Sequence, residues 1–89
     1  MKSYKVEFSA NALKKLKKIN PSIASTLFAW IKKNLDGTDN PRKHGKMLTG
    51  TLNKFWRYRV GNYRLISEIN DEIVSIIIIE IGHRSTIYK

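Results

Sequence analysis

Three arginines in one alternating segment are the residues of this chain best suited to chemistry. Arg57 and Arg59 stand two residues apart, and Arg64 follows them after the turn signal Gly61-Asn62. Residues two apart on a strand project from one face, and a tight turn brings the next strand alongside. The three guanidiniums are therefore expected to line one surface, where each can bind a phosphate through two parallel hydrogen bonds. A solvated sheet face without a ligand is the alternative interpretation.

A second candidate cluster closes the chain. Gly82-His83-Arg84 is followed four residues later by Tyr88. An imidazole titrates near neutral pH and can take or give a proton, so His83 is a candidate for catalysis. Arg84 could hold a phosphate, and Tyr88 could stack on a base or donate a proton. A purely structural histidine at the end of a strand is the competing interpretation.

The arginines lie within 28 residues, Asn40 to Ser67, that contain no Asp or Glu. Aromatic residues are interleaved with the cations there, and this mixture suits RNA or single-stranded nucleic acid, whose bases can stack. The net charge of +10 also favours an anionic partner, because self-repulsion destabilises so small a body. An acidic protein segment is the second candidate partner and a membrane surface a distant third. The further expected phosphate contacts are Arg42, Lys43, Lys46 and Lys54.

Composition excludes several classes of protein and site. The 89 residues fit a single domain, residues 1–89, and the absence of cysteine removes disulfide frameworks and thiolate metal sites. With two histidines and no recognisable nucleotide or zinc motif, we expect no metal and no cofactor. RNA cleavage needs neither, because the ribose 2′-hydroxyl supplies the nucleophile and side chains supply base, acid and positive charge. The N-terminus lacks an apolar signal segment, so we expect a cytoplasmic protein rather than a secreted or membrane protein.

The elements that must position these residues begin with a strand and two helices. Tyr4–Phe8 alternates as a strand does, and ANALKKLKKI after Ser9 has helical spacing. Asn20-Pro21 ends that helix, and a second helix is expected from about Ser22 to Asp36, giving an αα-hairpin. The segment from Thr38 to Asn53 is expected to be a loop with a short turn near Met47-Leu48.

From Lys54 the period of the sequence changes to two, which predicts strands. Tyr63–Ile69 should pair with the arginine segment, and Glu72–Ile81 should be the last strand. The last strand is apolar on both faces except for Glu80, so we place it centrally in the sheet. The expected order is βααβββ, an α+β fold with a helical hairpin packed on a mostly antiparallel four-stranded sheet.

These segments together resemble a known family. YKVEFSANALKKLKKI, RKHGKMLTG, WRYRVGNYRLI and IGHRSTIY are similar to the RelE/ParE superfamily of bacterial toxins, and RelE-type members in particular, from Tyr4 to Tyr88. The resemblance implies the toxin of a type II toxin–antitoxin pair that enters the ribosomal A site and cleaves mRNA without metal. It implies a catalytic surface built from the sheet arginines with Arg84 and Tyr88, and a catalytic histidine at His83. One departure is Phe55, which stands where some RelE members have lysine.

The resemblance also implies partners and leaves alternatives. The partners are the ribosome with its mRNA and an acidic, amphipathic antitoxin segment; the free toxin is expected to be monomeric and to form a hetero-oligomer with the antitoxin. A ParE-like toxin that blocks DNA gyrase is the first alternative. A non-catalytic relative that only binds RNA or the antitoxin is the second.

Overall fold

A computed structural model describes residues 3–48 and 55–83 of the chain, so Lys54, Arg84 and Tyr88 lie outside the described residues. Five strands and two helices follow one another along this part of the chain. They are β1 (Lys5–Phe8), α1 (Ala10–Lys18), α2 (Pro21–Asn34), β2 (Lys46–Met47), β3 (Trp56–Val60), β4 (Tyr63–Asn70) and β5 (Ser75–His83).

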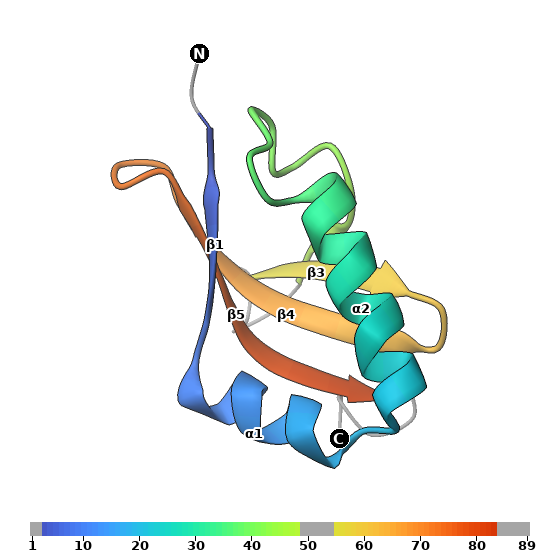
Figure 1. Cartoon of the computed structure of the whole chain (residues 1–89). Helices are drawn as coiled ribbons and strands as arrows, with labels where there is room; N and C mark the ends of the chain where they lie inside the picture. Colours follow the sequence, from blue (N-terminus) through green and yellow to red (C-terminus); the bar gives the residue numbers. More distant parts are fainter. Residues whose placement is uncertain (1–2, 49–54, 84–89) are drawn as a thin grey trace.

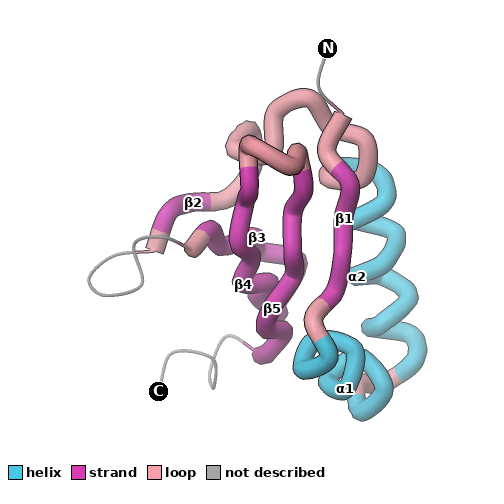
Figure 2. Tube along the Cα trace, turned by 90° about the vertical axis from the view of Figure 1, so that its left-hand side faces the viewer, coloured by secondary structure: helices cyan, strands magenta, loops and turns pink. Residues whose placement is uncertain are grey.

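The strands form one sheet in the order β1-β5-β4-β3-β2 (Figures 1 and 2). β1 runs parallel to β5, and the other neighbours are antiparallel. The α+β class predicted from the sequence is confirmed, with one strand more than expected. The additional strand is β2, which is only two residues long and therefore too short to show an alternating pattern within the predicted loop.

Both helices lie on one side of the sheet, but they cross each other instead of pairing as an antiparallel hairpin (Figures 1 and 2). The Ser9 side chain accepts a hydrogen bond from Ala12 N and donates one to Ile79 O, which holds the start of α1 beside β5. Ile19 ends α1 in an extended backbone conformation that redirects the chain, and Asn20 then caps α2 through its side chain. Neither described helix has the length and apolar character needed to cross a bilayer.

The core lies between α2 and the sheet. Leu27, Ile31 and Leu35 are buried from the helix side. In β5, Ile78 and Ile81 are both fully buried although they are three residues apart. A regular strand would direct them to opposite faces; the shift of register between β4 and β5 is a bulge that turns both towards the core. β5 lies between β1 and β4, so its predicted interior position is confirmed.

The last strand begins three residues later than its sequence predicts. Asn70 Oδ1 accepts hydrogen bonds from Glu72 N and Ile73 N, so these residues form the turn between β4 and β5. Val74 completes that turn with φ of 53°, an unfavourable conformation for a β-branched residue. The turn also brings Asp71 towards the loop that follows α2.

Candidate nucleic-acid interface

Four cations share the face of the sheet that points away from α2. The register sets Lys46 opposite Arg57 in one strand pair and Arg59 opposite Arg64 in the next. We call these four side chains the cationic face. Directly opposed residues in an antiparallel pair are close neighbours, and like charges at such positions are destabilising. Two consecutive like-charged pairs make this face a strong candidate for binding an anion.

Burial sharpens the case for an anion. Arg57 and Arg64 are half-buried and Arg59 is exposed. The Nε atom of Arg57 is buried and finds no hydrogen-bond acceptor within residues 3–48 and 55–83. The Nε and Nη1 atoms of Arg64 are also buried. Because a buried guanidinium nitrogen without an acceptor is costly, the oxygen of a bound phosphate would relieve a deficit that already exists at Arg57.

An acid stands at the rim of the cationic face, and sequence reasoning missed this position. The row that contains Arg57 continues through Ile66 to Glu80. Glu80 Oε1 accepts a hydrogen bond of 3.1 Å from Ile81 N and lies 3.5 Å from Lys15 Nζ. The sequence places Glu80 near His83 only, whereas the alternation of β5 combined with the strand register could have assigned it to the face of the arginines. Among the described residues, no three His, Asp or Glu side chains gather as a metal site requires.

His83 does not lie on the cationic face. It pairs with Tyr63, and the two rings meet edge to face with centroids 5.5 Å apart. Gly82 takes the position opposite Arg64, and strict alternation then turns His83 to the α2 side of the sheet. His83 and the three sheet arginines therefore lie on opposite faces of the sheet, and a catalytic role for His83 stays a prediction. The other two expected members of the C-terminal cluster, Arg84 and Tyr88, lie outside the described residues.

Arg42, an expected phosphate contact, is instead engaged within the protein. Its guanidinium donates to both oxygens of Asp71, at 3.1 and 3.0 Å, and lies 6.0 Å from the ring centroid of Trp56. Tyr4 Oη also donates to Asp71, at 2.6 Å. The hydrogen bond to Asp71 raises the pKa of Arg42, and it also raises the pKa of Tyr4. Lys43, the next residue, remains exposed and available for the predicted contact.

The loop that precedes β2 is tied to β3 by two aromatic side chains. Tyr58 Oη donates to Pro41 O at 2.6 Å, and Trp56 Nε1 donates to His44 O at 2.7 Å. Burial raises the pKa of Tyr58 to about 12. Gly45 completes the attachment with φ of +82°, and a Cβ there would lie 2.1 Å from Arg57 O. The loop is therefore fixed against β3 at Pro41, His44 and Gly45.

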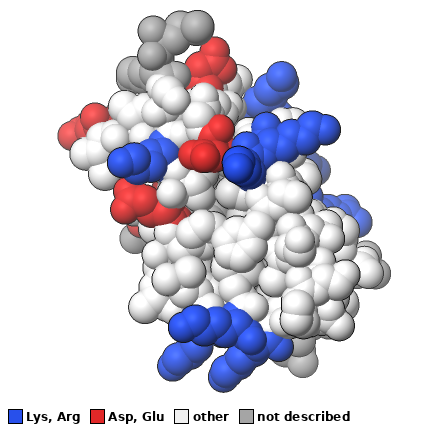
Figure 3. Space-filling view, in the orientation of Figure 1, with Lys and Arg blue, Asp and Glu red and all other residues white. Residues whose placement is uncertain are grey.

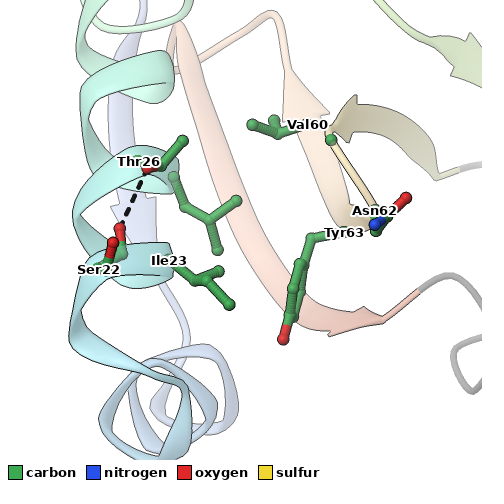
Figure 4. A pocket seen from close by; sticks show the side chains of 8 residues that line it. Ser22, Ile23, Thr26, Val60, Asn62 and Tyr63 are labelled. Carbon is green, nitrogen blue, oxygen red and sulfur yellow. Dashed lines mark hydrogen bonds between the residues drawn. The ribbon is translucent and has the colours of Figure 1, made fainter.

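Two apolar grooves lie on the helix side of the sheet. One of about 230 Å³ opens between α2 and the β3–β4 turn, with Ile23, Val60 and Tyr63 on its walls (Figure 4). The other, of about 330 Å³, lies between β1 and α2 beside Phe28, a residue that is 45% exposed. Their lining suits apolar side chains of a protein partner better than a nucleic acid.

A lysine cluster forms a separate positive surface. Its residues are the exposed Lys14, Lys15, Lys17 and Lys18 of α1. Figure 3 shows a blue patch at its lower end, where α1 lies in the same orientation in Figure 1. An uncharged surface separates this patch from the other cations visible in that view. The patch is the solvated side of an amphipathic helix, as its spacing in the sequence indicates.

Comparison with known proteins identifies the family. Residues 6–88 match the model described as the ParE toxin of the type II toxin-antitoxin system, parDE. Toxin RelG of Mycobacterium tuberculosis is 31% identical over 86 residues, which cover 97% of each chain.

Solved structures agree with this match. The toxin–antitoxin complex RelBE2 from M. tuberculosis contains a chain with a TM-score of 0.85 and 30% identity, covering 96% of this chain and 95% of that one. The isolated E. coli RelE toxin shares the fold, with a TM-score of 0.72, 24% identity and coverage of 91% and 84%. The chain therefore belongs to the RelE/ParE superfamily and is a toxin of the type II toxin–antitoxin class.

Proposed function

We propose that this toxin is a metal-independent endoribonuclease that cleaves mRNA on the ribosome. The observation that carries the proposal is the cationic face. In each of its two pairs one cation stands directly opposite another, and Arg57 Nε has no acceptor among the described residues. Such a surface is unfavourable in the free protein and becomes favourable when a phosphodiester lies on it.

The chemistry requires charge stabilisation at one phosphate. The 2′-oxygen loses its proton and attacks the adjacent phosphorus, and the bond to the 5′-oxygen breaks as that oxygen gains a proton. We assign Arg57, Arg59 and Arg64 to binding the phosphate and to stabilising the extra negative charge of the pentavalent state. The resemblance to RelE toxins adds Arg84 and Tyr88 to this set.

We propose a positioning role for His83. Since its ring packs on Tyr63, on the opposite side of the sheet from Arg64, we assign His83 to holding the strand end from which Arg84 follows. A direct proton-transfer role makes a different prediction. In that case His83→Ala would abolish cleavage. A positioning role predicts a smaller loss of cleavage.

The decisive experiment maps mRNA 5′ ends after the chain is induced in cells. Cuts inside translated codons that disappear in Arg64→Ala, but persist in Lys5→Ala, would support the proposal. Lys5 is a matched control because it is an exposed cation on β1, the strand at the other edge of the sheet. Growth arrest with uncut mRNA would reject the proposal.

We also propose an acidic, amphipathic antitoxin segment as the partner. The M. tuberculosis and E. coli relatives were solved in complexes with antitoxins, and this chain combines a net charge of +10 with two apolar grooves. Phe28→Asp should weaken antitoxin binding by placing an acid in the groove beside β1 without touching the cationic face. Equal binding by this variant and the parent chain would remove that groove from the proposed contact.

Inhibition of DNA gyrase is the competing function, because the matched family model carries the ParE description. A supercoiling assay separates the two functions. Inhibition of gyrase together with normal translation in a cell extract would replace the ribonuclease proposal.

A further inference from the structure

A hollow of about 350 Å³ lies behind the cationic face, at the outer edge of β3. It is lined by Trp30, His44, Gly45, Lys46, Arg57 and Arg59. Its size is that of a small-molecule site. β2 pairs only with Trp56 and Arg57. Because β3 continues past the end of β2, its edge at Arg59 is left uncovered by β2, and the hollow lies there.

One wall of the hollow is aromatic and held in place. The Trp30 ring meets the His44 ring at 5.8 Å and 68°, and it meets the Tyr58 ring at 5.8 Å and 53°. His44 is fixed in turn, because Trp56 Nε1 donates to its carbonyl. Aromatic surfaces of this kind bind bases of any sequence by stacking.

The opposite wall presents backbone. Leu48 N donates to Phe55 O, so the residues of β3 that bond towards β2 are Phe55 and, by alternation, Arg57 and Arg59. The ladder with β2 ends at Arg57, and the N–H and C=O of Arg59 therefore point to the edge where the hollow opens. An adjacent donor and acceptor can bond the polar edge of a planar heterocycle.

Three cations complete the site. Lys46, Arg57 and Arg59 line the hollow and also belong to the cationic face, so one continuous positive surface joins the two. We propose that the hollow is a nucleotide subsite of the RNA groove, which takes a base flanking the cleaved bond between the Trp30 wall and the β3 edge. The proposal rests on the proposed binding of RNA by the cationic face, but it adds a second place of contact that is not needed for cleavage itself.

The test uses the full chain and a 2′-O-methyl RNA trinucleotide, which cannot be cleaved because its 2′-oxygen carries no proton. The Trp30 and Trp56 indole N–H signals are followed by NMR during titration. We expect the Trp30 signal to shift strongly and the Trp56 signal, which reports the bond to His44 O, to shift less. A trinucleotide without its bases should still bind in a salt-dependent way but leave the Trp30 signal unmoved.

Variants locate the contact. His44→Ala should weaken trinucleotide binding roughly 5-fold or more, the lower end of what one stacked base contributes, while Lys5→Ala should change it less than 2-fold. Trp30→Leu should weaken trinucleotide binding to a similar extent. If Trp30→Leu fails to fold, His44→Ala still tests the contact.

The outcomes separate the subsite from the ribonuclease function. If the trinucleotide binds and Arg64→Ala weakens it, but neither the Trp30 signal nor His44→Ala responds, the subsite is wrong and the cationic face stands. If the Trp30 signal shifts with bases present but mRNA stays uncut in a translating extract, the subsite stands and the endonuclease proposal fails. If the trinucleotide does not bind at all, the subsite is overturned.

Discussion

The stretch from Asn40 to Ser67, which contains no Asp or Glu, holds one loop arginine and three sheet arginines in opposite surroundings. Arg42, in the loop, is paired through two hydrogen bonds with Asp71 from the β4–β5 turn. The sheet arginines face other cations instead, with Arg59 opposite Arg64 and Lys46 opposite Arg57. The same residue type from one stretch of sequence therefore stabilises the fold in one place and opposes it in the other.

The difference shows that distance along the chain from the nearest acid does not decide the role of a cation. Asp71 lies 29 residues after Arg42, and the β4–β5 turn brings it back to the loop. The register sets Arg57 opposite Lys46 and Ile66, and it sets Arg59 opposite Arg64, which also faces Gly82. Function is expected where the fold sets positive charges directly opposite one another at an unfavourable electrostatic energy.

Arg64→Ala tests the sheet arginines and should have the largest effect. Loss of a charge-stabilising donor should lower the cleavage rate about 100- to 1,000-fold, with little loss of folding stability. Cleavage is measured in a translating extract, with Lys5→Ala as the charge-matched control. An equal loss of cleavage in Arg42→Ala would erase the contrast between the two groups.

Gly45→Ala tests how much the close approach of the Arg42 loop to β3 matters for the stability of the fold. A Cβ would lie 2.1 Å from Arg57 O at a φ of +82°, so the loop must shift. Unfolding should become easier by about 1–3 kcal/mol, because both the clash and the positive φ are unfavourable. Thermal denaturation measures the change, and Gly61→Ala is the control, because it shares a positive φ but has open space around it. Equal losses in the two variants would assign the whole effect to backbone strain.

Much of this arrangement was accessible from the sequence. Alternation in β3, together with the Gly61-Asn62 turn, correctly placed the three sheet arginines on one face. The helices and the interior position of β5 followed from spacing and from its apolar run. These features are local, since each depends on neighbours within one or two elements.

The failures came from contacts between distant segments. Asp71 could not be paired with Arg42 before the loop and the turn were known to meet. β2 was too short to be seen, and with it the hollow at the edge of β3 was missed. His83 was predicted as a catalytic residue without a prediction of the face on which it lies, and one step of alternation after Gly82 turns it to the face opposite the arginines. A register fixed by the Gly61-Asn62 turn, and extended to β5, would have assigned that face.

Arg42→Ala tests the arginine that is paired with an acid, Asp71. The pair with Asp71 is about half exposed, so its loss should lower the free energy of unfolding by only about 0.5–1 kcal/mol. Lys43→Ala, which removes the same charge from the same loop, should cost less. Denaturant unfolding of the two variants at low salt provides the measurement. A stability of Arg42→Ala equal to that of Lys43→Ala would show that the ion pair contributes nothing to the fold.

Arg59→Gln should have the smallest effect and the opposite sign. Removing one of two directly opposed charges should raise the free energy of unfolding by about 0.2–1 kcal/mol. The gain should be largest at low ionic strength and shrink near 1 M salt, where the Debye length falls to about 3 Å and the parent chain no longer suffers the full repulsion. Chemical denaturation at two salt concentrations measures both quantities.

The same variant should cleave mRNA more slowly, since Arg59 belongs to the proposed phosphate site. If Arg59→Gln stabilises the fold and weakens cleavage, the charge of Arg59 serves function and lowers stability. Arg42→Ala should show the reverse, with lower stability and little change in cleavage. If Arg59→Gln were instead less stable than the parent chain at every salt concentration, the repulsion between Arg59 and Arg64 would not exist, and the main physical argument for an anion at this face would fall with it.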